Sequence, residues 1–539
     1  MFQSIQEKLI KQQFILNLIF ILSGTAMTWL FSRKGISSEE LKVFGIFVSF
    51  ILLAVLVFRY HFLEGVLQKI TPLHTVLAFL FASVTWYYYG YKTIIDILIH
   101  IMPNQETPTT LAYFGMATAT FAFFSILLWY GWFFEKFLRI VTQFTESLDK
   151  NERIILGVSS ILVTAAIMCV YYQTIIFYMP HEDNIIFNSD SSSLVQSNVY
   201  FFIEAPKNSI KQPLFGLYAM PFSVLARVLA KLLFFLPNGY IVLLAIIQAV
   251  LFQISLLLLS RMMNLSSFSK ILFLVLFNST YPVFVFSLTY EQYLFAVFWL
   301  ILFIYAYIFF KDDNEYYFIG AAGSMLTSGI LFPLLSHSKK WLEWIKDVLT
   351  NGGKFVVAAA IFGQLPVIMN PIHDIQKQLN NWSGHEISFG AKFLQYINFV
   401  ATCLIKPETK LNTQYLSYQL APVRELNYVG VALLVIALIG FLLNYQKLFA
   451  RICFSWAAFS FVLLCIIGWG TNENGLVLYT LYFSWAFLSL AYMAIESIAG
   501  KIPAVKYTII GGIIVAILVI NIPGILDLIQ FGINYYYVQ

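Results

Sequence analysis

Residues 240–261 read YIVLLAIIQAVLFQISLLLLSR, and this stretch decides the class of fold. Its only charged residue is Arg261, at the very end. A helix of about 20 apolar residues crosses a hydrocarbon core of roughly 30 Å. An α-helix also pairs its own backbone N–H and C=O groups, which lipid cannot do. We therefore interpret this stretch as a membrane-spanning helix.

Similar apolar stretches recur along the whole chain. Apolar residues make up 60% of the sequence and charged residues 11%, whereas soluble domains carry about 25% charged residues. The short alternating segments of a membrane β-barrel are absent. The sequence thus predicts an all-α, polytopic transmembrane protein with about 13–14 membrane segments. We expect helices near 12–32, 44–59, 72–90, 110–133, 154–179, 240–261, 268–289, 291–310, 354–371, 427–445, 452–470, 477–495 and 507–526. The further segment 318–335 is interrupted by Gly and Pro, which favours a re-entrant hairpin over a full span.

The Lys and Arg residues in the short loops predict the orientation. They gather on one side when the N-terminus is placed in the cytoplasm, with Arg33, Lys34 and Lys42 as the main exception. We expect a multi-pass protein of a bacterial plasma (inner) membrane, working in the cell envelope. The net charge of +5 is small and scattered, so it does not suggest nucleic acid as a partner. The apolar stretches make the lipid bilayer the expected partner.

Two long outward loops stand out, at residues 181–239 and 372–426. The apolar part of the first loop, 213–236, carries Arg227 and Lys231 and is expected to form helices in the membrane interface. We divide the chain into an N-terminal four-helix membrane extension, 1–150, and a core, 151–539.

The first loop carries three acids close to a predicted helix end: Glu182, Asp183 and Asp190. A carboxylate at the membrane surface can take a proton from an acceptor hydroxyl. It can also hold a divalent cation. The alternative is that these acids are solvated loop residues. Lys211, further along, either pairs with a lipid phosphate or is an ordinary interfacial anchor.

Two acids lie in very short outward turns, Glu291 in SLTYEQYLF and Glu473 in WGTNENGLVLY. Buried acids in membrane proteins are functional candidates because their burial is costly. Both also suit a turn that faces water. Arg424 is the one arginine of the second loop, where cations can attract a lipid-borne phosphate or simply the head groups.

The sequence lacks the motifs of zinc binding, nucleotide binding and Ser-His-Asp hydrolysis. The four cysteines have no zinc-ligand spacing, and the sequence contains no Walker A motif, GxGxxG or Ser-His-Asp pattern. No cofactor is indicated with certainty. Whether the acids hold a divalent cation is left open by the sequence.

Three segments together resemble a family. They are HEDNIIFNSDSSS (181–193), KQPLFGLYAMPF (211–222) and FNSTYPVFVFSLTYEQYLFAVFWLILFIY (277–305). Their order resembles the membrane glycosyltransferases of the GT-C superfamily, such as protein O-mannosyltransferases and aminoarabinose transferases. Those enzymes have an acidic first outward loop, then an element often written Lys/His-Pro-Pro-Leu, then a helix pair with an acid in its turn. Gln212 stands where the family often has Pro or His.

The resemblance implies a GT-C-like core and a reaction. A sugar would move from a polyprenyl-phosphate-linked donor to a glycan, lipid or protein acceptor at the outward face. Asp190 would be the base, with Glu182 or Asp183 as the alternative. Lys211 would contact the donor phosphate, and Glu291 would shape the pocket. Glu473 and Arg424 are further candidates for substrate binding.

Two other functions remain open. A transporter or flippase of lipid-linked glycans would need polar residues or paired broken helices deep in the membrane. A surface-polysaccharide polymerase or ligase would also use large outward loops, usually with several arginines.

Overall fold

The computed structural model describes residues 138–174, 176–177, 185–200, 212–309, 314–331, 341–361, 375–384, 386–471 and 475–538. The chain divides into two compact units. One comprises 1–147, 202–205 and 349–366, and the other comprises Leu148–Phe201, Pro206–Val348 and Val367–Gln539. The helices expected before residue 138 lie outside the described residues, so the four-helix extension stays a prediction.

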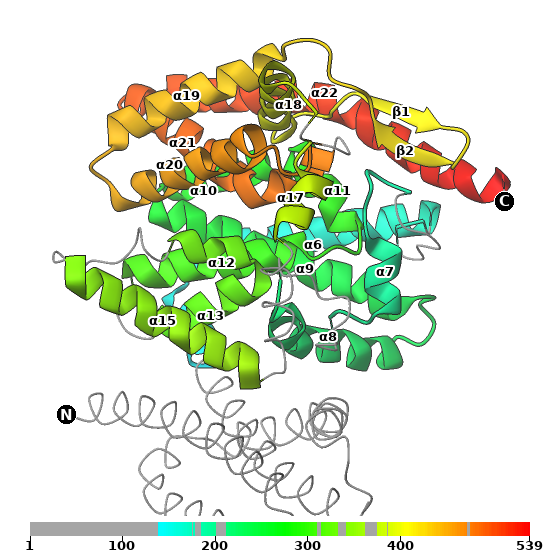
Figure 1. Ribbon diagram of the computed structural model, residues 1–539, viewed down its shortest axis with the longest axis horizontal. Coiled ribbons are helices and arrows are strands. Elements are labelled where there is room, and N and C mark those ends of the chain that lie inside the picture. The colour runs from blue at the N-terminus through cyan, green and yellow to red at the C-terminus, as the bar shows by residue number, and fades with distance from the viewer. Residues whose placement is uncertain are drawn as a thin grey trace, which may run out of the picture. The chain divides into compact units, whose positions relative to one another are not determined.

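The second unit is built almost entirely of helices (Figure 1). Its helices up to the second loop are α6 (Lys150–Gln173), α7 (Ser191–Gln196), α8 (Phe215–Leu232), α9 (Gly239–Met262), α10 (Ser267–Asn278), α11 (Tyr281–Leu288), α12 (Tyr293–Phe309), α13 (Asn314–Ser324) and the 3-10 helix η2 (Leu326–Ile330). The next helix along the chain is α15 (Trp341–Ile361). After it come α17 (Ile375–Trp382), α18 (Phe389–Thr402), strands β1 (Thr409–Asn412) and β2 (Ser417–Leu420), α19 (Tyr428–Asn444), α20 (Leu448–Phe461), the π-turn η3 (Val462–Ile466), η4 (Gly475–Tyr479), α21 (Thr480–Ala499) and α22 (Pro503–Val538).

The polytopic helical class is confirmed. Among the described residues, six helices are long and apolar enough to cross a membrane, or seven if the bent pair α10–α11 is one span. They are α6, α8, α9, α20 continued by η3 (Leu448–Ile466), α21 preceded by η4 (Leu476–Ala499), and α22. Helices α12 and α19 are apolar but shorter. Helix α8 meets the length and composition of a span, and its expected place in the membrane interface stays a prediction.

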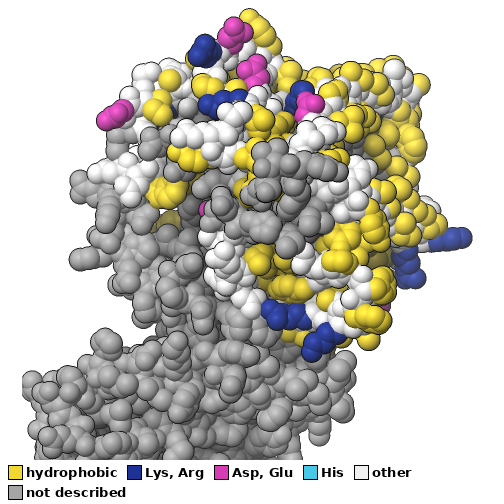
Figure 2. Space-filling view, turned by 90° about the vertical axis from the view of Figure 1, so that its right-hand side faces the viewer, with side chains coloured by type: hydrophobic (Ala, Val, Ile, Leu, Met, Phe, Trp, Pro, Cys, Tyr) yellow, Lys and Arg dark blue, Asp and Glu magenta, His cyan; other side chains and the backbone are white. Residues whose placement is uncertain are grey.

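The apolar surface fits a membrane environment. Helix α9 packs against α6, α8 and α12, whereas α6, α19 and α22 each leave an apolar face exposed. Leu442 of α19 and Val519 of α22 are examples, at 59% and 67% exposure. Figure 2 shows hydrophobic side chains over much of one face, with Lys and Arg side chains near its edges. Soluble proteins rarely expose apolar patches of this extent, whereas lipid covers them without cost.

The helix expected at 268–289 is wrong as a single helix. It is broken into α10 and α11, which bend by 68° at Ser279 and Thr280. Pro282 lies in the first turn of α11, where its missing N–H costs nothing. The side chain of Asn521 on α22 donates to the Ser279 carbonyl oxygen over 2.9 Å and so satisfies a group that the break exposes.

The second outward loop has a structure of its own. It contains α17, α18 and an antiparallel hairpin in which Thr409 lies opposite Leu420. This hairpin was not expected from the sequence. The segment expected to form a re-entrant hairpin is α13 followed by η2. Residues 332–340 lie outside the described residues, so its course through the membrane stays a prediction.

Candidate functional site

Glu291 lies in the short turn between α11 and α12, and its side chain faces the protein interior. The residue is only 4% exposed, and its backbone N–H donates to the Thr289 carbonyl oxygen over 3.0 Å. The alternative that this acid faces water in an open turn is therefore wrong. Burial of a carboxylate is costly unless hydrogen bonds compensate for the lost water.

The compensating donors come from the first outward loop. The backbone N–H of Asp190 donates to Glu291 Oε1 over 3.0 Å, and the Ser191 hydroxyl donates to the same oxygen over 3.3 Å. Hydrogen bonds to an ionised acceptor are the stronger kind. Glu291 thereby fixes the position of Asp190, although 101 residues separate the two in the chain.

Asp190 itself lies at the protein surface. It is the residue that precedes α7, it is exposed, and its side chain does not cap that helix. The structure thus places two predicted site residues side by side, one acid buried and the other at the surface. A carboxylate whose backbone is held by a buried partner is pre-organised to meet a ligand at the protein surface.

Tyr200 supports the turn from behind. Its phenolic O–H donates to the Glu291 carbonyl oxygen, and its side chain is fully buried. The rings of Tyr290 and Phe215 pack against it with centroids at 4.7 and 5.0 Å. Burial raises the pKa of Tyr200 well above its ordinary value, and the nearby Glu291 charge adds to this effect. Tyr200 therefore remains a hydrogen-bond donor.

Gln212 continues the polar layer beside this turn. Its amide donates to the Tyr482 hydroxyl over 2.9 Å, and the Tyr482 ring contacts Tyr293 at 5.1 Å. Sequence reasoning singled out Gln212 only as a departure from the family pattern. The structure gives it a buried partner on α21, a contact that no local pattern predicts.

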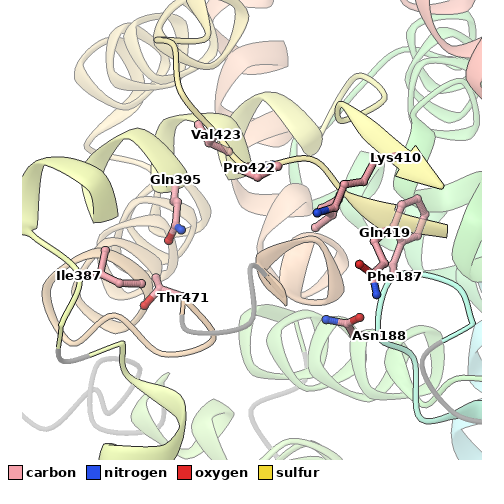
Figure 3. Close-up of a pocket in the computed structure, with 10 residues that line it drawn as sticks. Phe187, Asn188, Ile387, Gln395, Lys410, Gln419, Pro422, Val423 and Thr471 are labelled. Atoms are coloured by element: carbon pink, nitrogen blue, oxygen red, sulfur yellow. The ribbon is translucent and has the colours of Figure 1, made fainter. Parts of the chain in front are cut away.

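The two outward loops meet beside Asp190. Ile186 and Tyr418 form an isolated parallel β-bridge, in which the Tyr418 N–H donates to Ile185 and the Phe187 N–H donates to Tyr418, over 2.7 and 2.9 Å. A cavity of about 500 Å³ opens between the loops. The residues lining it are Phe187, Asn188, Ile387, Gln395, Lys410, Gln419, Leu420, Pro422, Val423 and Thr471 (Figure 3).

The remaining predicted residues have different outcomes. Arg424 is exposed and is not among the described residues that line the cavity, although its neighbours Pro422 and Val423 are. The others lie outside the described residues: Glu182, Asp183, Lys211 and Glu473. Within the described part of the chain, no three His, Cys, Asp or Glu residues are grouped as a metal site would require. Binding of a divalent cation by the acids therefore stays a prediction.

The site must be interpreted from its own chemistry. No protein-family model, no curated protein and no solved structure matches this chain.

Proposed function

We propose that this protein is a membrane glycosyltransferase that uses a sugar linked to polyprenyl phosphate. The sugar would pass to a glycan, lipid or protein acceptor at the outward face of the membrane. The proposal combines the GT-C-like order of the sequence segments with the contact between Asp190 and Glu291. That contact is the observation on which the proposal depends most.

The chemistry needs few groups because the donor already carries a good leaving group. Asp190 takes the proton from an acceptor hydroxyl while the hydroxyl oxygen attacks the anomeric carbon of the donor sugar. A C–O bond to the acceptor forms, and the bond between the sugar and the phosphate oxygen breaks. Polyprenyl phosphate leaves with the bonding electrons. Glu291 acts as a positioning residue because it holds the backbone of the base.

A transporter of lipid-linked glycans is the second candidate, and one observation favours it. The bent pair α10–α11 is a broken helix of the kind that transporters use near their binding sites. However, the Ser279 carbonyl oxygen at the bend already accepts from Asn521, which also donates to the Leu404 carbonyl oxygen over 2.8 Å. These hydrogen bonds hold the break in place and leave fewer backbone carbonyl groups for a substrate to bind.

The variant Asp190→Asn tests the proposed function. Asparagine keeps the backbone N–H that binds Glu291, and the side chain at this position is exposed, so we expect a folded protein. Loss of a general base typically lowers turnover by about 10²–10⁴-fold. The assay follows release of polyprenyl phosphate from polyprenyl-phosphate mannose, glucose and aminoarabinose in proteoliposomes, with a membrane extract as the source of acceptor.

The matched control is Glu425→Gln, which neutralises an exposed acid of the second loop. We expect it to turn over donor like the wild type. Wild-type turnover by Asp190→Asn would remove Asp190 from the reaction. Transport of an intact lipid-linked glycan without sugar transfer would favour the second candidate.

A further inference from the structure

Five of the ten residues that line the cavity between the two loops are polar, and three of those five carry a side-chain amide. Three side-chain amides reach it from three different segments: Asn188 from the first loop, Gln395 from α18 and Gln419 from β2. In Figure 3, Gln395 and Thr471 lie on one side, and Lys410, Gln419 and Asn188 lie on the other. An amide offers both donors and an acceptor, as a sugar hydroxyl also does. Such a lining suits a ligand that carries many hydroxyl groups.

One of these amides has hydrogen-bonding capacity to spare. The Oε1 atom of Gln395 is buried and accepts no hydrogen bond from any described residue. Buried polar atoms in proteins are nearly always paired, so an orphan acceptor on a cavity wall indicates a missing donor. Because the Gln395 side chain lines the cavity, rotation of its amide would present this acceptor to a ligand hydroxyl.

The wall on the first loop is held in a costly conformation. Phe187 and Asn188 have φ angles of 50° and 58°, in the left-handed region that bulky residues avoid. The bridge to Tyr418 and the packing of the Phe187 ring against Tyr281, at 6.2 Å, hold this turn in place. Strain of this kind persists where it positions a functional side chain. Here it brings Asn188 to the cavity two residues before Asp190.

The opposite wall is rigid for another reason. Gly468 and Gly470 have φ angles of 79° and 78°, and the N–H of Gly470 donates to the Trp382 carbonyl oxygen over 2.9 Å. A Cβ on Gly468 would lie 2.7 Å from the Ser383 carbonyl oxygen, so only glycine allows this close approach. The loop therefore presents Thr471 to the cavity from a fixed backbone.

Lys410 gives the cavity its charge. It lies directly opposite Gln419 in the hairpin, and the side chains of both residues line the cavity. No Asp or Glu is among the described lining residues. A single ammonium group beside three amides favours a polar ligand that carries one negative charge.

We propose that this cavity binds an acidic saccharide, with amides on the hydroxyl groups and Lys410 on a carboxylate. Resting on the proposed function, this inference makes an acidic glycan the acceptor. Its hydroxyl groups would then lie in a cavity whose wall is continuous with the segment that carries Asp190. The volume of about 500 Å³ falls in the range of small-ligand sites.

Binding can be measured separately from transfer. Full-length protein in lipid nanodiscs is titrated with methyl β-glucuronide and methyl β-glucoside, and binding is followed by saturation-transfer-difference NMR. We expect the wild type to prefer the glucuronide. The variant Lys410→Met should bind the glucuronide about fivefold more weakly, as the loss of a partly exposed ion pair implies, and Lys410→Arg should restore the preference. The glucoside should bind equally to all three.

The controls separate this inference from the proposed function. Lys447→Met removes an exposed lysine outside both outward loops and should bind like the wild type. Gln395→Leu should weaken both saccharides, because it removes an acceptor that hydroxyl groups use. Equal binding of the two saccharides, or unchanged glucuronide binding by Lys410→Met, would overturn the acidic-saccharide site. Asp190→Asn should bind the glucuronide like the wild type, because Asp190 does not line the cavity. If Asp190→Asn lost sugar transfer but none of the proteins bound either saccharide, the saccharide site would be overturned and the proposed function would stand.

Discussion

At the scale of single residues, Glu291 connects the stability of the turn to the position of Asp190. Its Oε1 accepts from the Asp190 N–H and the Ser191 hydroxyl. Glu291→Gln keeps an oxygen acceptor but loses the charge, and uncharged hydrogen bonds are roughly half as strong. We predict near-wild-type thermal unfolding and a drop in donor turnover of about fivefold. Glu291→Leu leaves both donors unpaired, at a cost of about 1–3 kcal/mol each, and should lose turnover and stability together.

The test compares donor turnover and thermal unfolding between Glu291→Gln and Glu291→Leu. Glu425→Gln again serves as the charge control, because Glu425 is exposed. If Glu291→Leu turned over donor as fast as the wild type, the position of Asp190 would not depend on Glu291. A complete loss of turnover in folded Glu291→Gln would instead make the negative charge itself part of the reaction.

Glu152 carries the second prediction at the residue scale. It lies in the first turn of α6, and its carboxylate binds Arg261 of α9 at 2.5 Å and Lys270 of α10 at 2.6 Å. The Glu152 side chain is 5% exposed and those of the two cations 12%. Glu152→Gln leaves two nearly buried cations facing each other, which typically costs about 3–5 kcal/mol. Arg261→Gln should cost less, since Lys270 still pairs with the acid.

Thermal unfolding of the purified protein in detergent checks the order of these two variants. Glu408→Gln neutralises an exposed acid and should unfold like the wild type. A larger loss for Arg261→Gln than for Glu152→Gln would mean that the arginine contributes chiefly through packing of its chain.

At the scale of elements, the bend between α10 and α11 depends on α22. Asn521 is fully buried, donates to the Ser279 and Leu404 carbonyl oxygens, and accepts from the Lys406 N–H over 2.8 Å. Asn521→Leu would remove the partner of the Ser279 carbonyl oxygen and of the Lys406 N–H, whereas the Leu404 carbonyl oxygen would still accept from the Tyr281 N–H over 3.3 Å. We predict a loss of about 1–3 kcal/mol in the free energy of unfolding, measured by titration with a denaturing detergent. Asn534→Leu, an exposed position on the same helix, should leave the stability unchanged. Equal stability of both variants would show that water replaces Asn521 at the bend.

The sequence predicts those helices whose apolar pattern lies within the helix itself. The helix expected at 240–261 is α9 at Gly239–Met262, because an unbroken apolar run specifies its own helix. The break before Tyr281 had a local signal in Pro282, since a residue before proline avoids the helical conformation. The prediction of a single helix rested on the length of the apolar run alone. The partner that stabilises the break, Asn521, lies about 240 residues away and leaves no trace in the local pattern.

In the candidate site, too, single residues could be predicted from the sequence and the contacts between them could not. Asp190 and Glu291 could each be singled out because acids are rare near membrane helices. Their contact, the donation from Tyr200 and the polar partner of Gln212 are tertiary and could not be predicted. The cavity was missed because its amides come from three separate segments, each with an ordinary loop or helix composition. The positive φ angles at Phe187 and Asn188 were equally hidden, since only Asn, and not Phe, is common in that conformation.

At the scale of the whole molecule, the membrane topology decides whether the acids face a lipid-linked donor. Tyr415, 70% exposed, lies between β1 and β2, while Lys447 follows α19. Helix α19 is apolar and has 17 residues, so at about 1.5 Å per residue it covers most of a hydrocarbon core. We therefore predict that these two positions lie on opposite sides of the membrane, with Tyr415 outside.

Single cysteines at these positions test this topology in intact cells. Of the native cysteines, Cys169 is exposed and the other three are buried, so Cys169→Ser is a suitable background. A membrane-impermeant maleimide should label Tyr415→Cys directly and Lys447→Cys only after the membrane is permeabilised. The opposite pattern would invert the orientation and place Asp190 in the cytoplasm, away from an outward acceptor. Labelling of both positions in intact cells would mean that α19 does not cross the membrane, and the two loops would then have no common outward face.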